Sequence, residues 1–426
     1  MGSRSDVNAW LKVHNACYIF LKKCSPNERE EGSERSSHHM ITSRCHINVQ
    51  CTYRTYKEKR YQTQVFLPPR QVKSCARQAQ VTSMAPGKLL FSSQRTLKTC
   101  IKMYCGDYIQ GTIFPAPNFN PIMDAQLLGG ALQGISCEKD VLIDILTQRC
   151  NSQRLMIAEA YRDMYGRDLI MDLKENLSHH FKEVMVGLMY PPASYDAHEL
   201  WHALKGVDTE EKCLIDILAS RSNTEIFQMK EAYLMQYNND LQQDIDSETS
   251  GHFRDTLMNL AQGTRMEVYA DPSTAAQDAM ILWEACQRKT GEHKNMLQMI
   301  LCNKSYQQLW MVFQEFQNIS GQDIVDAINE CYDGYFQELL VAIVLCVRDK
   351  PSYFAYRLYN AIHDCGFHNK TVIRILIARS EIDLMNIRQR YKERYGKSLF
   401  HDIKHFASGH YESALLAICA GDAEDY

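Results

Sequence analysis

The sequence predicts an all-α protein built from four homologous units that pack together, preceded by a basic segment without a recognisable fold. The segment GALQGISCEKDVLIDILTQR at 130–149 returns 72 residues later as HALKGVDTEEKCLIDILASR at 202–221. From Asp124 onward, apolar residues recur at helical spacing. The charge also divides the chain, because residues 1–102 carry a net +12 and the remainder a net −16.

Residues 1–102 show no sustained helical or alternating period, and we expect them to be unstructured or a gene-model extension. The segment CHINVQC at 45–51 has metal-like spacing, but no second ligand pair matches it, so a zinc site is not expected. The excess of Lys and Arg leaves an alternative open, in which this segment attaches to an acidic membrane or to nucleic acid.

Residues 103–120 form a short tail, and YCGDYIQGTIFPAPNFN at 104–120 is a candidate docking segment for a protein partner. The longest apolar run, LLVAIVLCV at 339–347, is too short to span a bilayer and predicts a buried helix. The sixteen cysteines form no framework of short spacings, and no secretory leader opens the chain. We therefore expect a cytoplasmic protein that associates reversibly with membranes, with a nuclear location as the alternative.

The four units are expected at 121–190, 191–263, 264–350 and 351–426. In the second unit, a short buried helix with the LIDIL run is followed by a helix with an apolar stripe at i, i+3, i+7 and i+11. Each unit reads as about five short helices with more apolar surface than it can bury alone, so the four must pack together. Basic residues at equivalent positions anchor the alignment: Arg149, Arg221, Lys304 and Arg379.

The second unit contains a candidate calcium site. A loop that turns back on itself exposes backbone carbonyls, and a bidentate carboxylate from elsewhere completes an oxygen cage suited to calcium. The candidate ligands are the loop residues Leu204, Gly206 and Asp208 and the downstream Glu248, forty residues after Asp208.

A purely structural interpretation of these residues is also open. Asp208 or Thr209 could cap the following helix, with Glu211 at its third position. The negative charge of Glu248 could simply interact favourably with the dipole of the helix that starts near Ser250.

Motifs spread over residues 105–426 resemble the annexin family. The resemblance implies a curved disc of four five-helix repeats, whose convex face binds acidic phospholipid through calcium in the loops. It therefore implies a peripheral membrane protein, with calcium as its cofactor. The motifs are the K-G-x-x-T-E loop, LIDILASRS at 214–222, GRDL at 166–169, ETSG at 248–251, IARSEIDL at 377–384, RYGKSLF at 394–400 and the terminal AICAGDAEDY.

The resemblance also implies that three of the four calcium sites are degenerate. The neutral amide of Asn176 cannot act as a bidentate charged ligand, and the Cys331 thiol suits soft metals rather than calcium. Only the second repeat keeps both halves of a site, so we expect weak calcium binding at one place. The altered positions are Ser136 and Asn176 in repeat 1, Lys289 and Cys331 in repeat 3, and Asp364 and Phe406 in repeat 4.

A second feature implied by the family is a set of polar residues between the repeats. The structural interpretation is that they form ion pairs which fix the orientation of the repeats, and the alternative is a role in ion conduction. The matching positions are Asp196, Glu199, Asp216, Arg221 and Arg379.

No enzyme motif is present. The segment GKS at 396–398 resembles the end of a phosphate-binding loop, but the upstream glycine that such a loop needs is replaced by Tyr391. We expect a non-enzymatic, monomeric protein that binds acidic phospholipid weakly, because its core is acidic and its calcium sites are reduced. The core is not expected to bind nucleic acid. The alternative function is a calcium-independent protein-interaction scaffold.

Overall fold

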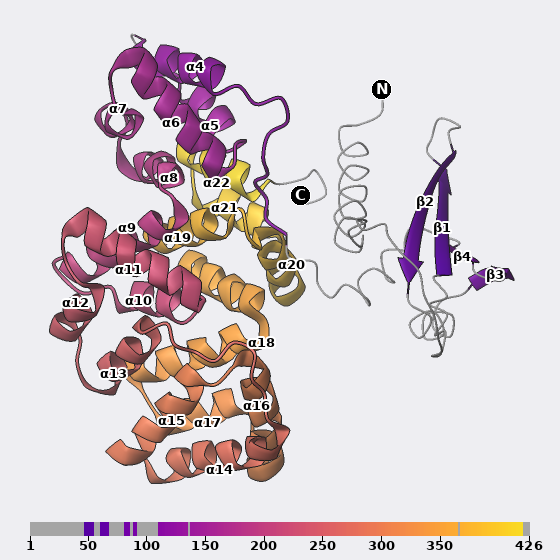
Figure 1. Cartoon of the computed structure of the whole chain (residues 1–426). Helices are drawn as coiled ribbons and strands as arrows, with labels where there is room; N and C mark the ends of the chain where they lie inside the picture. The colour runs from indigo at the N-terminus through magenta and orange to yellow at the C-terminus, as the bar shows by residue number, and fades with distance from the viewer. Residues whose placement is uncertain are drawn as a thin grey trace, which may run out of the picture. The chain divides into compact units, whose positions relative to one another are not determined.

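The computed structural model describes residues 110–134, 137–364 and 367–420 in full, together with the backbone of four strands nearer the N-terminus. The chain divides into two compact units, Met1–Tyr108 and Ile109–Tyr426, which are described separately (Figure 1). Among the described residues, every helix lies in the second unit.

The described strands of the first unit form two antiparallel pairs. β1 (Ile47–Arg54) pairs with β2 (Arg60–Leu67), and β3 (Val81–Ala85) pairs with β4 (Lys88–Phe91). The segment INVQCTYR alternates mostly β-branched or aromatic residues with polar ones, a pattern that favours strands. Cys45 and His46 of the metal-like segment lie outside the described residues.

The second unit is all-α and contains four repeats, as the sequence predicted (Figure 1). Each repeat supplies five helices, and the last helix of repeat 3 continues directly into the first helix of repeat 4 as α18. The helices are α4 (Pro121–Gln133), α5 (Lys139–Leu146), α6 (Asn151–Tyr165), α7 (Leu169–Asn176) and α8 (His179–Met189) in repeat 1; α9 (Pro192–Lys205), α10 (Glu211–Leu218), α11 (Asn223–Tyr237), α12 (Leu241–Glu248) and α13 (Gly251–Ala261) in repeat 2; α14 (Pro272–Arg288), α15 (Gly291–Asn303), α16 (Tyr306–Ser320) and α17 (Ile324–Cys331) in repeat 3; α18 (Gly334–His363); and α19 (Asn369–Arg379), α20 (Leu384–Tyr395), α21 (Leu399–Phe406) and α22 (Gly409–Cys419) in repeat 4.

The third helix of each repeat ends in the same way. Its C-cap residue has a left-handed backbone, with φ of 65° at Gly166, 53° at Asn238, 71° at Gly321 and 76° at Gly396. Glycine and asparagine adopt this conformation at the lowest steric cost, so they stop the helix and turn the chain toward the next one.

Helix α18, which spans the junction of repeats 3 and 4, is bent rather than straight. Asp349 has φ −159° and ψ 95°, and Pro351 follows two residues later. Proline removes a helical hydrogen bond and disfavours a helical residue before it, which accounts for the kink. The apolar run at 339–347 lies in the first half of α18, and most of its side chains are buried, as predicted. No helix of the described residues is both long and apolar enough to cross a membrane.

Apolar side chains of all four repeats form one core. The LIDIL residues of repeat 2 are buried, as are Ile226, Met229 and Tyr233 of the predicted stripe. Buried tyrosines also attach the third helix to the fourth in three repeats. Their hydroxyls donate hydrogen bonds of 2.6–2.7 Å, from Tyr161 to Asp172, from Tyr233 to Asp244 and from Tyr391 to Asp402. Repeat 4 packs against both repeat 1 and repeat 2, through α8 with α22 and α9 with α19.

The first described residues of the tail are bound to repeat 4, whereas Ala116 exchanges hydrogen bonds with the Gln153 side chain of repeat 1. Thr112 N–H donates to the Ser380 carbonyl at 2.7 Å, and its hydroxyl donates to the Ile418 carbonyl at 2.6 Å. Gln110 exchanges hydrogen bonds with the segment Met385–Asn386. Thr112 and Ile113 are buried by this docking.

Candidate calcium sites and the polar centre

The candidate calcium loop of repeat 2 connects α9 to α10. It closes where Glu210 N–H donates to the Ala203 carbonyl at 2.9 Å. Gly206 is required by the close approach of the backbone, because a Cβ there would lie 3.0 Å from the His202 carbonyl oxygen and 3.2 Å from that of Asp208. The loop therefore gathers backbone carbonyl oxygens in a small space, and these are ligands that calcium accepts.

Glu248, the last residue of α12, faces this loop. Its carboxylate lies 3.3 Å from Lys205 Nζ, which also lies 3.0 Å from the Asp244 carboxylate. Hydrogen bonding to Asp244 raises the pKa of Lys205. The structure thus brings the loop and Glu248 together, and the Lys205 ammonium group forms an ion pair with the Glu248 carboxylate. Lys205 and Asp244 were missed by sequence reasoning, and the only signal for them was the presence of opposite charges in the two segments.

The capping alternative is wrong for this loop. Helix α10 begins at Glu211 with Glu210 as its N-cap, and no side chain accepts a hydrogen bond from its first turn. Asp208 and Thr209 therefore cap nothing. The side chain of Asp208 is exposed, Leu204 is buried at the end of α9, and Val207 at the loop tip is fully exposed.

The equivalent positions in repeats 1 and 4 offer poor calcium ligands. Asn176 Nδ2 donates to the Asp172 carbonyl at 2.9 Å, while Ser136 lies outside the described residues. In repeat 4, Asp364 caps the C-terminus of α18, and Phe406 lies against aromatic rings. The centroid of its ring is 5.3 Å from that of His363 and 6.3 Å from that of Phe367.

Repeat 3 has a cation and a thiol at the equivalent positions. Lys289 ends α14 with a left-handed backbone, φ 55°, and Cys331 is the last residue of α17. Both line the same pocket. Within residues 110–134, 137–364 and 367–420, no three His, Cys, Asp or Glu side chains are grouped so as to hold a metal ion. A calcium ion in this part of the chain would therefore depend on backbone carbonyls.

The polar residues expected between the repeats differ in the partners that they bind. Arg221 binds Asp196 through two hydrogen bonds of 2.7 and 2.9 Å within repeat 2. Arg379 binds Asp383 in the same way within repeat 4, and its guanidinium stacks 4.8 Å from the centroid of the Phe354 ring. Each of these pairs joins two residues of the same repeat.

Asp216 makes several of the contacts that join repeat 2 to repeat 4. Its carboxylate accepts hydrogen bonds from Tyr353 at 2.6 Å, from Arg357 at 2.6 Å and from Arg374 at 2.7 Å. Burial alone would raise the pKa of Asp216, but the guanidinium groups of Arg357 and Arg374 outweigh it and lower the pKa to about 2. The two arginines were not among the sequence-predicted residues. An arginine inside the apolar run TVIRILIAR was the available signal for Arg374.

Glu199 lies beside this centre. Arg374 Nη1 is 4.0 Å from the Glu199 carboxylate. Burial raises the pKa of Glu199 to about 7, and the attraction of Arg374 only partly offsets it. Glu199 thus titrates near neutral pH while Asp216 stays ionised.

Comparison with known proteins identifies the fold. The annexin family model matches residues 123–188, 195–260, 277–343 and 353–418. Human annexin A10 is 82% identical over 324 residues, which are 76% of this chain and 100% of that protein. The structure of annexin III has a TM-score of 0.72 and 44% identity, covering 74% of this chain and 98% of its own. Calcium-bound annexin (Sm)1 has a TM-score of 0.66 and 27% identity, covering 74% and 94%. The chain belongs to the annexin family.

Proposed function

We propose that this protein binds acidic phospholipid surfaces through calcium, and that repeat 2 holds its single, weak calcium site. The candidate ligands are the loop carbonyls of Leu204, Gly206 and Asp208 and the carboxylate of Glu248. One observation carries the proposal: the loop of repeat 2 and Glu248 are bridged by Lys205, so an oxygen-rich loop and a carboxylate lie together. Repeats 1, 3 and 4 offer an amide, a thiol and a phenyl ring instead.

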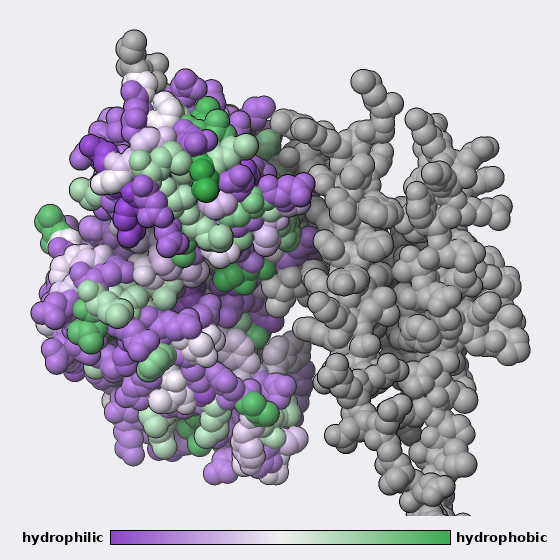
Figure 2. Space-filling model, turned by 45° about the horizontal axis from the view of Figure 1, so that its top comes forward, coloured by the Kyte–Doolittle hydropathy of each residue, from purple (hydrophilic) through white to green (hydrophobic). Residues whose placement is uncertain are grey.

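The exposed tip of the loop supports a role at a membrane surface. Val207 projects fully into solvent, next to the carbonyls that would hold calcium. On the face seen in Figure 2, hydrophilic residues cover most of the described surface, and apolar residues form small separate groups. Attachment through calcium and a loop tip fits this surface better than attachment through a broad apolar face. Such a protein acts by binding, as a peripheral membrane protein in the cytoplasm or the nucleus, and not as an enzyme.

The test is co-sedimentation with phosphatidylserine vesicles over a calcium titration. The full chain and a chain beginning at Met103 are compared, each with and without Glu248→Gln. Calcium-dependent pelleting of both, removed by the substitution, is the expected result. Pelleting that ignores calcium and needs residues 1–102 would assign binding to the basic extension. No pelleting of either chain at millimolar calcium would contradict the proposal.

The alternative is a calcium-independent scaffold that docks a protein partner through the face of the disc or through the tail at 104–120. Within the tail, Gln110, Thr112 and Ile113 are engaged by repeat 4. A partner that grips these residues would first have to displace them. The stretch 104–109 lies outside the described residues, and a partner could still use it.

A further inference from the structure

Two cysteines from different helices of repeat 3 lie next to each other at the pocket that Lys289 lines. Cys286 lies in the last turn of α14, and Cys331 is the last residue of α17. Helices α14 and α17 pack together, and the Tyr332 hydroxyl donates to the Ala285 carbonyl at 2.8 Å. These two residues are the sequence neighbours of the cysteines, so this hydrogen bond holds the two helix ends together beside both thiols.

The thiols are close enough to affect each other electrostatically. Burial raises the pKa of the Cys286 thiol to about 12, and interaction with the Cys331 thiol contributes to this rise. Burial also raises the pKa of the Tyr332 hydroxyl, and both Cys286 and Cys331 add to it. Since Cys286 is protonated at neutral pH, it does not react with oxidants by itself.

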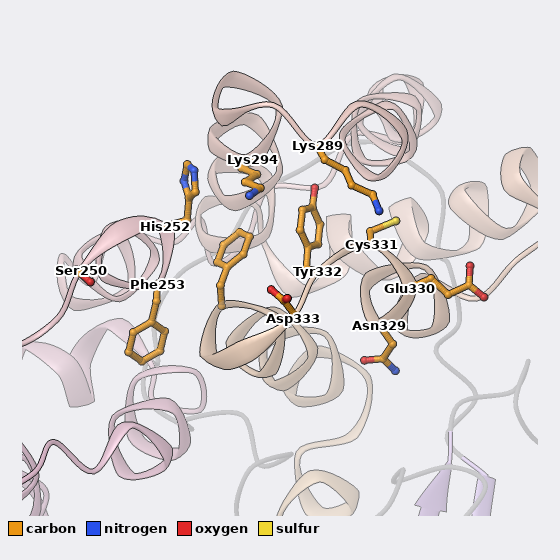
Figure 3. Close-up of a pocket in the computed structure, with 11 residues that line it drawn as sticks. Ser250, His252, Phe253, Lys289, Lys294, Asn329, Glu330, Cys331, Tyr332 and Asp333 are labelled. Carbon is orange, nitrogen blue, oxygen red and sulfur yellow. The ribbon is translucent and has the colours of Figure 1, made fainter.

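The two thiols differ in their access to solvent. Cys286 is 1% exposed, whereas Cys331 is partly exposed and lines an open pocket with a volume of about 560 Å³. Figure 3 shows the Lys289 side chain pointing toward the Cys331 sulfur. A nearby ammonium group favours the thiolate, which is the form that reacts with oxidants. A small oxidant that enters the pocket therefore reaches Cys331 first, with Cys286 behind it.

We propose that Cys331 is a site of oxidation by peroxide and that Cys286 resolves the product as a reversible disulfide. The Cys331 thiolate attacks one oxygen of hydrogen peroxide, so that an S–O bond forms, the O–O bond breaks, and the departing hydroxide takes up a proton to become water. The Cys286 sulfur then attacks the sulfenic sulfur of Cys331. The S–S bond forms, the S–O bond breaks, and the second oxygen leaves as water with the Cys286 proton. Two thiols are thereby oxidised, and one peroxide is reduced to two waters.

The disulfide would connect the end of α17 to the last turn of α14, next to the left-handed backbone of Lys289. A cross-link of this kind lowers the entropy of the unfolded chain, so the oxidised protein should unfold at a higher temperature. A small thiol such as glutathione reverses the bond by exchange and is itself oxidised to a disulfide. In a reducing compartment the bond is therefore transient, as in redox-sensing proteins.

The test uses the full chain without calcium or lipid. The protein is reduced, freed of reductant and incubated with hydrogen peroxide. Remaining thiols are blocked with N-ethylmaleimide, and the protein is digested without reduction for tandem mass spectrometry. A parallel sample contains dimedone, which traps sulfenic acids. The variants are Cys286→Ala, Cys331→Ser and the matched control Cys137→Ser, which removes the other partly exposed thiol among the described residues.

We expect a pair of peptides joined between Cys286 and Cys331, lighter by two hydrogen atoms, in wild type and in Cys137→Ser. Cys286→Ala leaves Cys331 without a resolving thiol, so dimedone labelling of Cys331 should rise severalfold. Reduced glutathione should remove the link. Oxidation should raise the unfolding temperature of wild type by several degrees, and this shift should be absent from Cys331→Ser.

The inference is overturned if folded wild type forms no such link, if Cys331 proceeds to sulfinic acid instead, or if the link appears only after unfolding in urea. No step needs calcium, so these outcomes are independent of the proposed site in repeat 2. Loss of calcium-dependent pelleting would leave the disulfide unaffected, and absence of the disulfide would leave the calcium titration unchanged.

Discussion

The ammonium group of Lys205 lies 3.3 Å from the carboxylate of Glu248, so the acid of the candidate calcium site already has a cationic partner within the same repeat. Calcium must compete with this partner, because both cations need the same oxygens. The contact gives a physical reason to expect weak calcium binding that the alignment of glycines and acids alone does not supply.

We therefore predict that Lys205→Met strengthens calcium binding. Removing one positive charge about 3 Å from the carboxylate should increase calcium affinity by about three- to tenfold, the range expected for a partly exposed pair. The measurement is a calcium titration followed by calorimetry or by vesicle co-sedimentation. Lys212→Met, which removes an exposed lysine of α10, is the matched control and should leave the affinity unchanged. Equal or weaker binding after Lys205→Met would show that Lys205 does not compete.

The contacts of Asp216 with repeat 4 predict a large loss of stability in Asp216→Asn. The substitution leaves the buried guanidinium groups of Arg357 and Arg374 without their carboxylate, and such losses reach about 3–5 kcal/mol. Urea denaturation of the variant would measure the change in the free energy of unfolding. Asp255→Asn removes a solvent-exposed partner of Arg254 and should cost less than about 1 kcal/mol.

The same carboxylate predicts a loss of stability in acid. Its folded-state pKa of about 2 lies below the ordinary value of 3.8. Its contribution to stability is therefore complete above pH 4 and disappears as the pH falls from about 4 to 2. Thermal denaturation across this range should show wild type approaching the low stability of Asp216→Asn. Parallel curves for the two proteins would contradict the assignment.

Glu199 predicts the opposite dependence on pH. Its folded-state pKa of about 7 lies above the ordinary value of 4.5, so the folded protein disfavours the ionised form that the unfolded chain adopts. Stability is lost as the pH rises from about 4.5 to 7. Glu199→Gln should therefore stabilise the protein by about 1–3 kcal/mol at pH 8 and have little effect at pH 4.5. Denaturation at both pH values tests this, with the exposed Glu231→Gln as a control.

The docked tail predicts that Gly111→Ala releases it from repeat 4. A Cβ at residue 111 would lie 2.5 Å from the Ser380 carbonyl oxygen and 2.6 Å from the Glu381 carbonyl carbon, and backbone cannot give way as a flexible side chain can. Amide exchange at Thr112, which donates to Ser380, should become faster, while exchange in α11 stays as in wild type. Unchanged protection of Thr112 would show that the contact can adjust.

The repeats are evident from the sequence, but contacts between distant partners are not. The capping role considered for Asp208 was plausible in isolation, and the structure shows instead that the loop closes through Glu210 and Ala203. The partners of Asp196 and Arg379 lie within their own repeats, whereas Asp216 binds arginines of repeat 4, and sequence spacing does not distinguish the two cases.

The sequence by itself determined the four helical units and the side chains at the candidate calcium positions. These features depend on periodicity and on the chemistry of single residues, which are local. Only the tertiary structure decided that Arg357 and Arg374 meet Asp216, that Lys205 binds Glu248, and that Lys289 and Lys294 share a pocket with Glu330 and Asp333. Those contacts arise when helices distant in sequence pack together, and no spacing along the chain specifies which charges will then face each other.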